Sequence, residues 1–291
     1  MEQADSRRLL AQTGRVARVA SLIADSLRLP ALAEGNRFLA QRLARFVAGH
    51  GLRELDALID AERTDQLRSI VGVQNSWFWR EPEQFPFLVE HLGEPLRRER
   101  PLRIWSAAAS AGQEPYSLAM AFLEATQPNA PAVQILATDL DAAALELGRR
   151  GIYDASALTQ LPEAMRLWLV PAQLASGGPA WQVRPEVCQL VEFKSLDLLS
   201  LSWCGADEPS VLGMEGGLFD AIFCRNVLLY FDAPYRYAVL EGLARRLAPG
   251  GLLCLGLSES IGLAGHFFEP CGRGMYLRPI RTPRMSKEVI E

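Results

Sequence analysis

The sequence predicts an α/β protein in which an all-α helical bundle is followed by a doubly wound domain with a mostly parallel sheet. Up to residue 95, apolar side chains recur at three- and four-residue spacing, as in RVARVASLIADSL, which is typical of amphipathic helices. After Pro101, short apolar runs such as VQILATDL alternate with helical patterns, which indicates a sheet covered on both faces. About forty residues then follow Gly151 before the next apolar run, far more than a strand–helix connection needs. We therefore expect a small antiparallel β-subdomain there.

These patterns divide the chain into segments. We expect a helical domain over residues 1–95, a sheet domain over 96–284 and a polar tail over 285–291. Helices of the first domain are expected near residues 9–27, 36–50, 54–60 and 62–71, with a further one in EPEQFPFLVEHL. The inserted β-subdomain is expected over residues 152–194. In it, PEAMRLWLV favours a helix and WQVRPEVCQLVEF favours two short strands that turn at Arg184–Pro185.

The sheet domain is expected to alternate strands with helices along the chain. The expected order is strand LRIWSAAA, helix PYSLAMAFLEATQ, strand VQILATDL, helix DAAALELGRRG, the insert, and strands in CQLVEFKSLDLL, FDAIFCRNV and GGLLCLGLS. Parallel strands joined in this way place their carboxyl ends at one edge of the sheet, where such folds bind ligands. Candidate functional residues are therefore sought where each strand ends.

Composition argues against several kinds of partner and site. The 291 residues carry a formal net charge of −4, whereas sequence-independent binding of nucleic acid needs an excess of Lys and Arg. The five cysteines include no Cys-x-x-Cys pair and the three histidines lie far apart, so neither a metal site nor a disulfide framework is expected. MEQADSRRLL does not resemble a signal peptide, and no apolar run approaches the roughly 18 residues that span a bilayer. We expect a soluble cytoplasmic protein.

The first strand runs directly into a loop of small residues. LRIWSAAA leads through Ser110 and Ala111 to Gly112, and a helix is expected to begin near Pro115. Small side chains from Ala107 to Gly112 would let a nucleoside approach the backbone. The loop has one glycine in place of a G-x-G-x-x-G pattern, which disfavours NAD, and no P-loop is present. A tight turn whose small residues serve packing alone is the alternative.

Acidic side chains follow the next strands and the loop. Asp139 ends ILATD, where a carboxylate suits the two hydroxyls of a ribose, although Asp141 is the better candidate to cap the next helix. Asp197 in KSLDLL lies where a third strand would deliver a side chain toward an adenine amino group, with Ser195 or a turn as alternatives. Glu114 lies in a first helical turn, where the helix dipole stabilises a carboxylate with or without a cationic ligand.

Two further segments combine polar and aromatic residues. Arg80 in NSWFWRE follows three large aromatic residues, for which packing between domains is an equally good interpretation. FDAIFCRNVLLYFD is a fourth strand that ends in Arg225 and Asn226 ahead of Tyr230. Polar groups at the carboxyl end of a sheet strand face the ligand crevice of an open α/β fold.

Together these segments resemble the CheR chemotaxis receptor methyltransferases, which use S-adenosylmethionine (SAM) to methylate glutamate side chains. SWFWRE is similar to that family's Thr-x-Phe-Phe-Arg-Glu signature, and SAAASAGQEPYSLAM to its Ser-Thr-Gly-Glu-Glu-Pro-Tyr-Ser stretch. ATDLD and RRGIY are similar to its second-strand region, and FCRNVLLYFD to its Cys-Arg-Asn-Val-x-x-Tyr-Phe-Asp segment. The four motifs occur in order and cover most of the chain. The resemblance implies a Rossmann-like class I methyltransferase fold and S-adenosylhomocysteine (SAH) as product.

The resemblance also implies roles for individual residues. With Ala107 and Gly112 of the small-residue loop, the cofactor-binding residues would be Gln74, Ser76, Arg80, Glu114, Asp139, Asp197, Leu198, Arg225 and Asn226. Arg80 and Tyr230 would border the reacting methyl group as catalytic residues. The sequence departs from the family pattern in having Ser76 for Thr, Trp79 for Phe, Gln113 for the first Glu, and Gln74 for Asn.

The expected partners are the cytoplasmic helices of methyl-accepting chemoreceptors, with membrane association only through the receptor. Arg37, Arg42, Arg45 and Arg53 form a basic stretch without acidic residues that could steer Glu-rich helices, although a solvated arginine face is the alternative. In some members of the family the β-subdomain binds a receptor's C-terminal peptide. Two other functions stay open: methylation of another protein or a small molecule, and a non-catalytic module that binds SAH or the receptor.

Overall fold

The computed structural model describes residues 14–27, 37–63, 76–92, 100–126, 133–198, 217–231 and 233–280. The chain divides into two compact units. Unit 1 comprises Met1–Asn75 with Leu229–Pro234, and unit 2 comprises Ser76–Leu228 with Tyr235–Glu291. The aromatic segment that begins at Ser76 thus groups with the sheet. The domain limits given above remain a prediction, and the expected tail lies outside the described residues.

Unit 1 is helical in its described part. Its helices are α2 (Arg15–Leu27), α3 (Arg37–His50) and α4 (Leu52–Asp60), which confirms three of the expected helices. Most of the fourth, expected over residues 62–71, lies outside the described residues. The three helices pack on one another through a small apolar core of Val19, Leu43, Ala44, Leu55 and Ile59. Arg15 on α2 also donates two hydrogen bonds to Asp56 on α4, at 2.5 and 2.7 Å.

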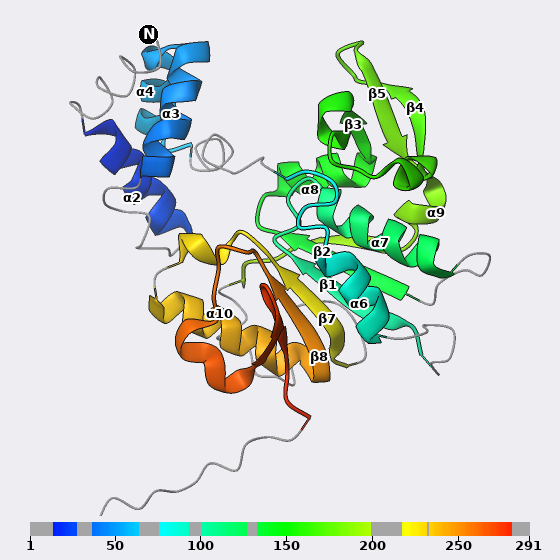
Figure 1. Ribbon diagram of the computed structural model, residues 1–291. Helices are drawn as coiled ribbons and strands as arrows, with labels where there is room; N and C mark the ends of the chain where they lie inside the picture. The colour runs from blue at the N-terminus through cyan, green and yellow to red at the C-terminus, as the bar shows by residue number, and fades with distance from the viewer. Residues whose placement is uncertain are drawn as a thin grey trace, which may run out of the picture. The chain divides into compact units, whose positions relative to one another are not determined.

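Unit 2 is built on a seven-stranded sheet (Figure 1). Its strands are β1 (Leu102–Ala107), β2 (Val133–Asp139), β6 (Val191–Ser195), β7 (Phe219–Cys224), β8 (Leu247–Leu255), β9 (Glu269–Gly272) and β10 (Met275–Leu277). The strand order is β6-β2-β1-β7-β8-β10-β9, with β10 antiparallel to both its neighbours and the other pairs parallel. The predicted mixed α/β class with a doubly wound sheet is confirmed.

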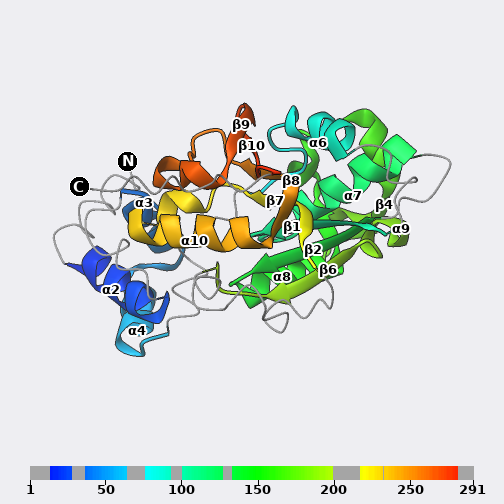
Figure 2. The same ribbon diagram turned by 90° about the horizontal axis from the view of Figure 1, so that it is seen from below.

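Helices cover both faces of this sheet: α6, α7 and α8 lie on one side and α10 lies on the other (Figures 1 and 2). The helices of unit 2 are α6 (Gln84–Leu92), α7 (Gln113–Thr126), α8 (Ala142–Arg150), α9 (Pro185–Cys188) and α10 (Ala233–Arg246). Short 3-10 turns occupy Ala155–Leu158, Glu163–Trp168, Leu228–Tyr230 and Gly262–Phe267. In the described part of the chain, no helix is both long and apolar enough to span a membrane.

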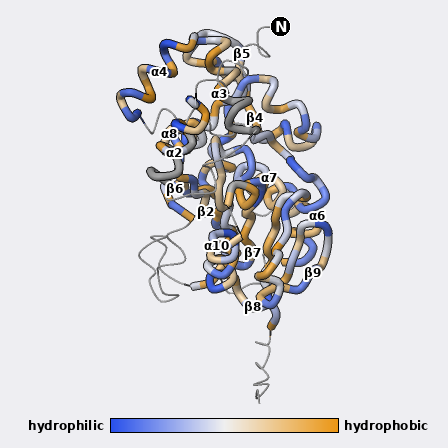
Figure 3. Tube along the Cα trace, turned by 90° about the vertical axis from the view of Figure 1, so that its left-hand side faces the viewer, coloured by the Kyte–Doolittle hydropathy of each residue, from blue (hydrophilic) through white to orange (hydrophobic). Residues whose placement is uncertain are grey.

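The core of unit 2 follows from the alternation of side chains along its strands. Ile104 and Phe223 belong to the cluster that packs against α6 and α7, whereas their neighbours Trp105 and Ile222 are buried on the opposite face. Because both faces are covered, the central strands β1 and β7 are buried at every position. β7 and β8 are accordingly apolar over most of their length (Figure 3).

The insert forms a separate antiparallel sheet, as expected. β3 (Ile152–Asp154), β4 (Leu169–Gln173) and β5 (Pro179–Val183) pair in the order β3-β5-β4. The expected helix in PEAMRLWLV is a 3-10 helix that gives way to β4 at Leu169.

The prediction that two strands pair with each other through a turn at Arg184–Pro185 is wrong. Pro185 opens the short helix α9, a position that proline favours because it has no N–H to leave unpaired. The second predicted arm is β6, which pairs parallel to β2 at the edge of the large sheet. Its half-buried pattern suits an edge strand in either sheet, so the sequence pattern could not tell which sheet it joins.

At the amino ends of β1 and β7, a buried carboxylate ties the two strands together. Asp220 accepts hydrogen bonds from Arg100 Nη1 and Nη2, at 2.8 and 2.9 Å, and from the Arg103 N–H, at 2.9 Å. Replacing Asp220 with Ala leaves that N–H buried without an acceptor, so the free energy of unfolding is expected to fall by about 1 to 3 kcal/mol. Urea denaturation measures the change. Glu241→Ala, which removes an exposed i,i+4 pair, is the control and should change it by less than about 0.5 kcal/mol; equal losses would contradict the role of burial.

Candidate functional site

The strand order reverses direction at β1, and candidate site residues gather at the carboxyl ends of the strands around this point. β2 and β6 lie on one side of β1, and β7 and β8 lie on the other. The connections from β1 to α7 and from β7 onward therefore diverge, which leaves the strand ends between them accessible to a ligand. The motif residues Glu114, Asp139, Arg225 and Asn226 lie at these ends or just after them, whereas SWFWRE lies ahead of α6.

The small-residue loop after β1 follows an unusual backbone path. Ala108, Ser110 and Gly112 have φ values of +77°, +50° and +91°, a region in which bulky side chains are strained. The N–H groups of Ala108 and Ala109 both donate to Thr138 O at 2.8 Å, and the Gly112 N–H donates to Ala109 O at 3.0 Å. Since these N–H groups donate within the protein, the loop is not a phosphate cradle.

Packing explains why residue 112 is glycine. A Cβ there would lie 3.0 Å from the Gly148 Cα, 3.0 Å from the Tyr153 hydroxyl and 3.1 Å from the Phe193 ring. The Tyr153 hydroxyl also donates to Ala111 O at 2.6 Å, so the insert braces the loop. Packing, which was the alternative explanation for the small residues of this loop, thus explains the glycine at residue 112. Its predicted contact with the cofactor stays a prediction, as does that of Ala107, whose side chain is buried in β1.

Asp139 joins the end of β2 to the loop after β1. Its Oδ2 accepts the Ser110 N–H at 2.8 Å, and its Oδ1 accepts the Asp141 N–H at 2.9 Å. Burial raises the pKa of Asp139 above its ordinary value, although these N–H groups act in the opposite direction. Asp141 caps α8 by accepting from the Ala143 and Ala144 N–H groups, as predicted. Asp139 is therefore available to bind at the sheet edge without being needed as the helix cap.

The end of β6 lies beside the end of β2. Ser195 pairs with Asp139 across the two strands, and the Leu196 N–H donates to Asp139 O at 3.0 Å. Asp197 is half-buried and Leu198 is buried just beyond this point. The structure thus brings Asp197 and Leu198 to the same edge as Asp139, as the strand order requires.

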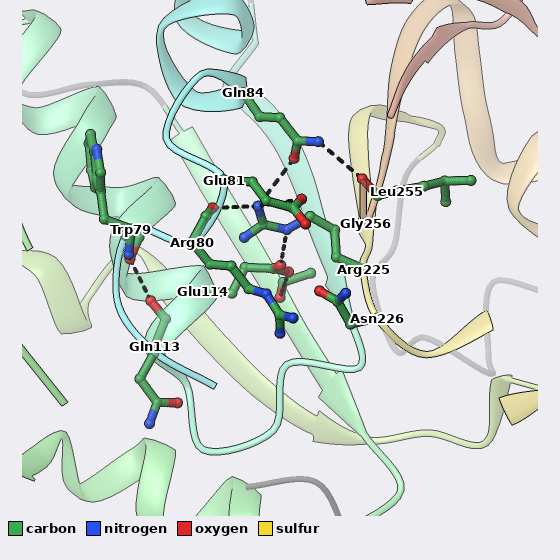
Figure 4. Close-up of polar contacts among 12 residues, drawn as sticks. Trp79, Arg80, Glu81, Gln84, Gln113, Glu114, Arg225, Asn226, Leu255 and Gly256 are labelled. Atoms are coloured by element: carbon green, nitrogen blue, oxygen red, sulfur yellow. Dashed lines mark hydrogen bonds and ion pairs between the residues drawn. The ribbon is translucent and has the colours of Figure 1, made fainter. Parts of the chain in front are cut away.

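The buried guanidinium of Arg225, at the end of β7, connects three segments of the chain (Figure 4). Its side chain is 2% exposed. Nε donates to Glu114 Oε2 at 2.6 Å, and Nη1 donates to Arg80 O at 2.6 Å and to Gln84 Oε1 at 3.1 Å. Glu81 Oε2 lies 3.5 Å from Nη1. Charged hydrogen bonds of this kind are strong when they are shielded from water.

Neighbouring contacts fix the partners of Arg225 in turn. Glu114 also accepts from Ser106 Oγ at 2.6 Å, and Gln84 donates to Leu255 O, at the end of β8, at 3.0 Å. The guanidinium carbon of Arg225 lies 5.6 Å and 5.4 Å from the ring centroids of Phe85 and Phe223, within the range of cation–π attraction. β1, β7, β8 and α6 are thereby coupled through one cation.

The aromatic segment ahead of α6 is held in a strained path. Trp79 and Glu81 have φ values of +61° and +56°. The Trp79 N–H donates to Ser117 Oγ at 3.0 Å, and Glu81 Oε1 accepts the Leu257 N–H at 3.0 Å. Phe78 is fully buried against Tyr153, with its ring edge to face at 4.9 Å. The segment therefore packs into the core of unit 2, and such over-determined strain is typical of functional sites.

The side chain of Arg80 has a different environment from its backbone. Whereas its carbonyl accepts from Arg225, its guanidinium lies 4.4 Å from the Trp77 ring centroid. In Figure 4 the side chain extends away from the Arg225 guanidinium. Burial lowers the pKa of Arg80, but an arginine stays protonated at neutral pH. Arg80 is thus a cation whose backbone is fixed by the network and whose guanidinium lies against Trp77, within reach of the charges of Glu81, Glu114 and Glu259.

Asn226, next to Arg225, also has a left-handed backbone, with a φ of +59°. Its N–H donates to Glu259 Oε2 at 2.7 Å, and the Gly256 N–H donates to the same oxygen at 2.8 Å. Asn226 Oδ1 is buried and accepts no hydrogen bond from any residue that the structure describes. A buried acceptor without a donor is costly, so it points to a ligand.

Some predicted site residues cannot be compared with the structure. Gln74 lies outside the described residues, and Tyr230 is described only as the end of the 3-10 turn Leu228–Tyr230. Ser76 is half-buried ahead of Trp77. Arg37, Arg42 and Arg45 all lie on α3, but their side chains are outside the described part; Arg53, on α4, is exposed.

Sequence reasoning missed several residues of the network. These are Glu81, Gln84, Ser106, Gly256 and Glu259. Some had a signal: Glu81 ends the SWFWRE motif, and Gln84 is a polar residue at the start of an apolar helix. Glu259 had none, because a glutamate in a polar loop after a strand is ordinarily a solvated residue.

The site residues fit a cationic nucleoside cofactor. In the described part of the site, the carboxylates of Glu81, Glu114, Asp139 and Glu259 accompany the guanidinium groups of Arg80 and Arg225. Asn226 Oδ1 adds an acceptor in need of a donor. A doubly wound fold with such groups at the switch point of its sheet is typical of proteins that bind a nucleoside cofactor there.

Comparison with known proteins identifies the family. Residues 74–275 match the family model described as CheR methyltransferase, SAM binding domain. Chemotaxis protein methyltransferase 2 of Pseudomonas aeruginosa is 39% identical over 199 residues, covering 68% of each chain. A chemotaxis protein methyltransferase of Vibrio parahaemolyticus is 38% identical over 238 residues, covering 79% of this chain and 77% of that protein. The chain belongs to the CheR methyltransferase family, and its resemblance to a SAM-dependent methyltransferase is confirmed.

Replacing Arg225 with Lys tests the network. A lysine keeps the charge but cannot reach Glu114, Gln84 and the Arg80 carbonyl together as the planar guanidinium does. The free energy of unfolding is expected to fall by about 1 to 3 kcal/mol because buried acceptors lose their donors. Urea denaturation measures this fall, with Arg245→Lys, in an exposed pair on α10, as the control. If Arg225→Lys unfolds like the control, the guanidinium does not organise the strand ends.

Proposed function

We propose that this protein transfers the methyl group of SAM to glutamate side chains of methyl-accepting chemoreceptors, forming γ-carboxyl methyl esters and SAH. The observation that carries this proposal is the meeting of three motif segments at the strand ends. The Arg80 backbone and the Glu114 carboxylate are both bound to Arg225, at the place where open α/β sheets bind ligands. The names of the similar proteins, which are chemotaxis methyltransferases, support the substrate class.

The chemistry needs alignment more than acid–base catalysis. When bound, SAM supplies a methyl group on a positively charged sulfonium. A glutamate side chain, with an ordinary pKa of about 4.3, is already ionised at neutral pH, so no general base is required. The protein has to hold the two reactants in line and exclude water between them. Alignment of this kind can lower a barrier by about 7 to 11 kcal/mol.

Each cofactor-binding residue has a proposed task. Asp139 would accept hydrogen bonds from the ribose hydroxyls, and Asp197 and Leu198 would bind the adenine. Glu114 would offset the positive charge of the cofactor, and Asn226 Oδ1 would accept a hydrogen bond from it. The remaining proposed contacts are Gln74, Ser76, Ala107, Gly112 and Arg225, of which Arg225 acts mainly by fixing the others.

Arg80 and Tyr230 are the proposed catalytic residues. The Arg80 guanidinium would bind the incoming carboxylate and orient it toward the methyl group. Its contact with Trp77 supports this role, because an aromatic face shields a cation from water and strengthens its ion pairs. Tyr230 would donate a hydrogen bond at the same place.

The substrate would be guided to the site by charge. α3 carries Arg37, Arg42 and Arg45 and no acidic residue, which suits the Glu-rich cytoplasmic helices of a chemoreceptor. Because the proposed substrate helices are cytoplasmic, we place the reaction in the cytoplasm. The protein would associate with the membrane only through the receptor. The small sheet is the candidate site for a receptor C-terminal peptide, since β4 has one edge unpaired in the described part of the chain.

The role of Asp139 is tested by the pH dependence of SAH binding. Because burial raises the pKa of Asp139, its carboxylate is lost at a higher pH than that of an ordinary aspartate. Affinity is therefore expected to be full above this raised pKa and to fall as the pH drops through it. Calorimetric titration from neutral to acidic pH measures this fall. Asp139→Ala should weaken binding by about 1 to 3 kcal/mol at neutral pH and flatten the profile; unchanged affinity would remove Asp139 from the site.

The reaction itself is tested with receptor-enriched membranes and methyl-labelled SAM. We expect label in the receptor as a base-hydrolysable ester, and we expect it to disappear when the receptor glutamates are replaced with Ala. Arg80→Ala should lose most of the transfer while keeping its circular dichroism spectrum. Label that survives loss of the glutamates would indicate another substrate, and SAH binding without ester in any mixture would indicate a non-catalytic module. Normal turnover by Arg80→Ala would contradict the task given to Arg80.

A further inference from the structure

Glu259 lies at the meeting point of β7 and β8, in the loop that follows β8. A single oxygen, Oε2, accepts two backbone N–H groups, that of Asn226 at 2.7 Å and that of Gly256 at 2.8 Å. Gly256 directly follows β8 and Asn226 is the second residue after β7, so both lie just beyond the carboxyl ends of adjacent parallel strands. One carboxylate thus joins the two strand ends on one side of the switch point.

We propose that Glu259 is a positioning residue that holds Asn226 in the conformation needed to bind the cofactor, an inference that rests on the function proposed above. Asn226 has a φ of +59°, which only a few non-glycine residues adopt readily, asparagine among them. A chain in this region needs an anchor to keep it there. The hydrogen bond from its own N–H to Glu259 supplies that anchor.

Gly256 leaves the space that the side-chain amide of Asn226 occupies. A Cβ at residue 256 would lie 2.7 Å from Asn226 Nδ2 and 2.8 Å from Glu259 Oε2. Glycine at residue 256 therefore lets the Asn226 amide pack on the backbone just after β8, where a side chain would collide with it. Glu259 and Gly256 therefore act together: one fixes the backbone of Asn226 and the other makes room for its amide.

The consequence of this arrangement is seen at Asn226 Oδ1. This atom is buried and accepts no hydrogen bond from the described residues. A protein that fixes an amide and leaves its acceptor buried without a donor loses stability, unless a ligand provides the donor. A carboxylate that only tied two strands together would have no need to fix the residue that carries this atom.

Substitutions at Glu259 separate positioning from charge. Glu259→Ala removes both hydrogen bonds and should weaken SAH binding at least tenfold, which is about 1.4 kcal/mol. Glu259→Gln keeps an amide oxygen that can accept both N–H groups, so its affinity should stay within about threefold of the unchanged protein. Calorimetric titration with SAH, well below the melting temperature of each variant, measures both. Glu241→Ala on the surface of α10 is the control and should bind normally.

A double-mutant cycle shows whether Glu259 acts through Asn226. If it does, Glu259→Ala combined with Asn226→Ala should bind SAH no more weakly than Asn226→Ala alone. Gly256→Ala, whose Cβ would crowd both the Asn226 amide and the Glu259 carboxylate, should lose at least as much affinity as Asn226→Ala. This second variant keeps the test decisive if Glu259→Ala does not fold.

Several outcomes would overturn the inference. Additive losses in the double mutant would mean that Glu259 acts independently of Asn226, and equal losses for the Gln and Ala variants would mean that its charge is what matters. Normal SAH binding by Glu259→Ala or Gly256→Ala would also contradict the positioning role of Glu259. If the unchanged protein binds no SAH, the proposed function itself fails. If it does bind SAH and these variants also bind normally, only the role of Glu259 fails.

Discussion

The buried guanidinium of Arg225 is the group on which the arrangement of the strand ends depends. It cannot lose its charge at any ordinary pH, and it is almost completely shielded from water. A cation in such a place has to be surrounded by acceptors, or its desolvation would prevent folding. Glu114, Gln84 and the Arg80 carbonyl meet this need, and in doing so they bring together segments far apart in the sequence.

Strained backbone occurs in several segments around this cation. Trp79 and Glu81 ahead of α6, Ala108 and Ser110 after β1, and Asn226 after β7 all have positive φ values. Each of these backbone conformations costs free energy that contacts within its own segment do not offset. The network and the burial of Phe78 hold the segment ahead of α6. Thr138 O and Asp139 hold the loop after β1, and Glu259 holds Asn226. Pre-organisation of this kind is what a reaction without a general base requires, because alignment is then the main contribution that the protein can make.

The insert has a structural role besides any role in binding a partner. The Tyr153 hydroxyl donates to the loop at Ala111, and the Tyr116 hydroxyl on α7 donates to Gly148 O on α8 at 2.7 Å. Gly112 and Gly148 lie close together because neither has a side chain. The small-residue loop thus packs against Gly148 and is held by a hydrogen bond from Tyr153. A predicted ligand-facing loop is therefore also a tightly packed joint between α7, α8 and the small sheet.

The sequence by itself determined the fold class, the helices of the described bundle, the cap at Asp141 and the motif segments that identify the family. These features depend on local periodicity, helix-end chemistry and the order of residues along the chain, all of which can be seen in one dimension. Only the tertiary structure decided that Val191–Ser195 joins the large sheet, that Gly112 is needed for packing, and that Glu259 anchors Asn226. Such contacts join residues distant along the chain, and a local pattern cannot specify which buried groups will meet.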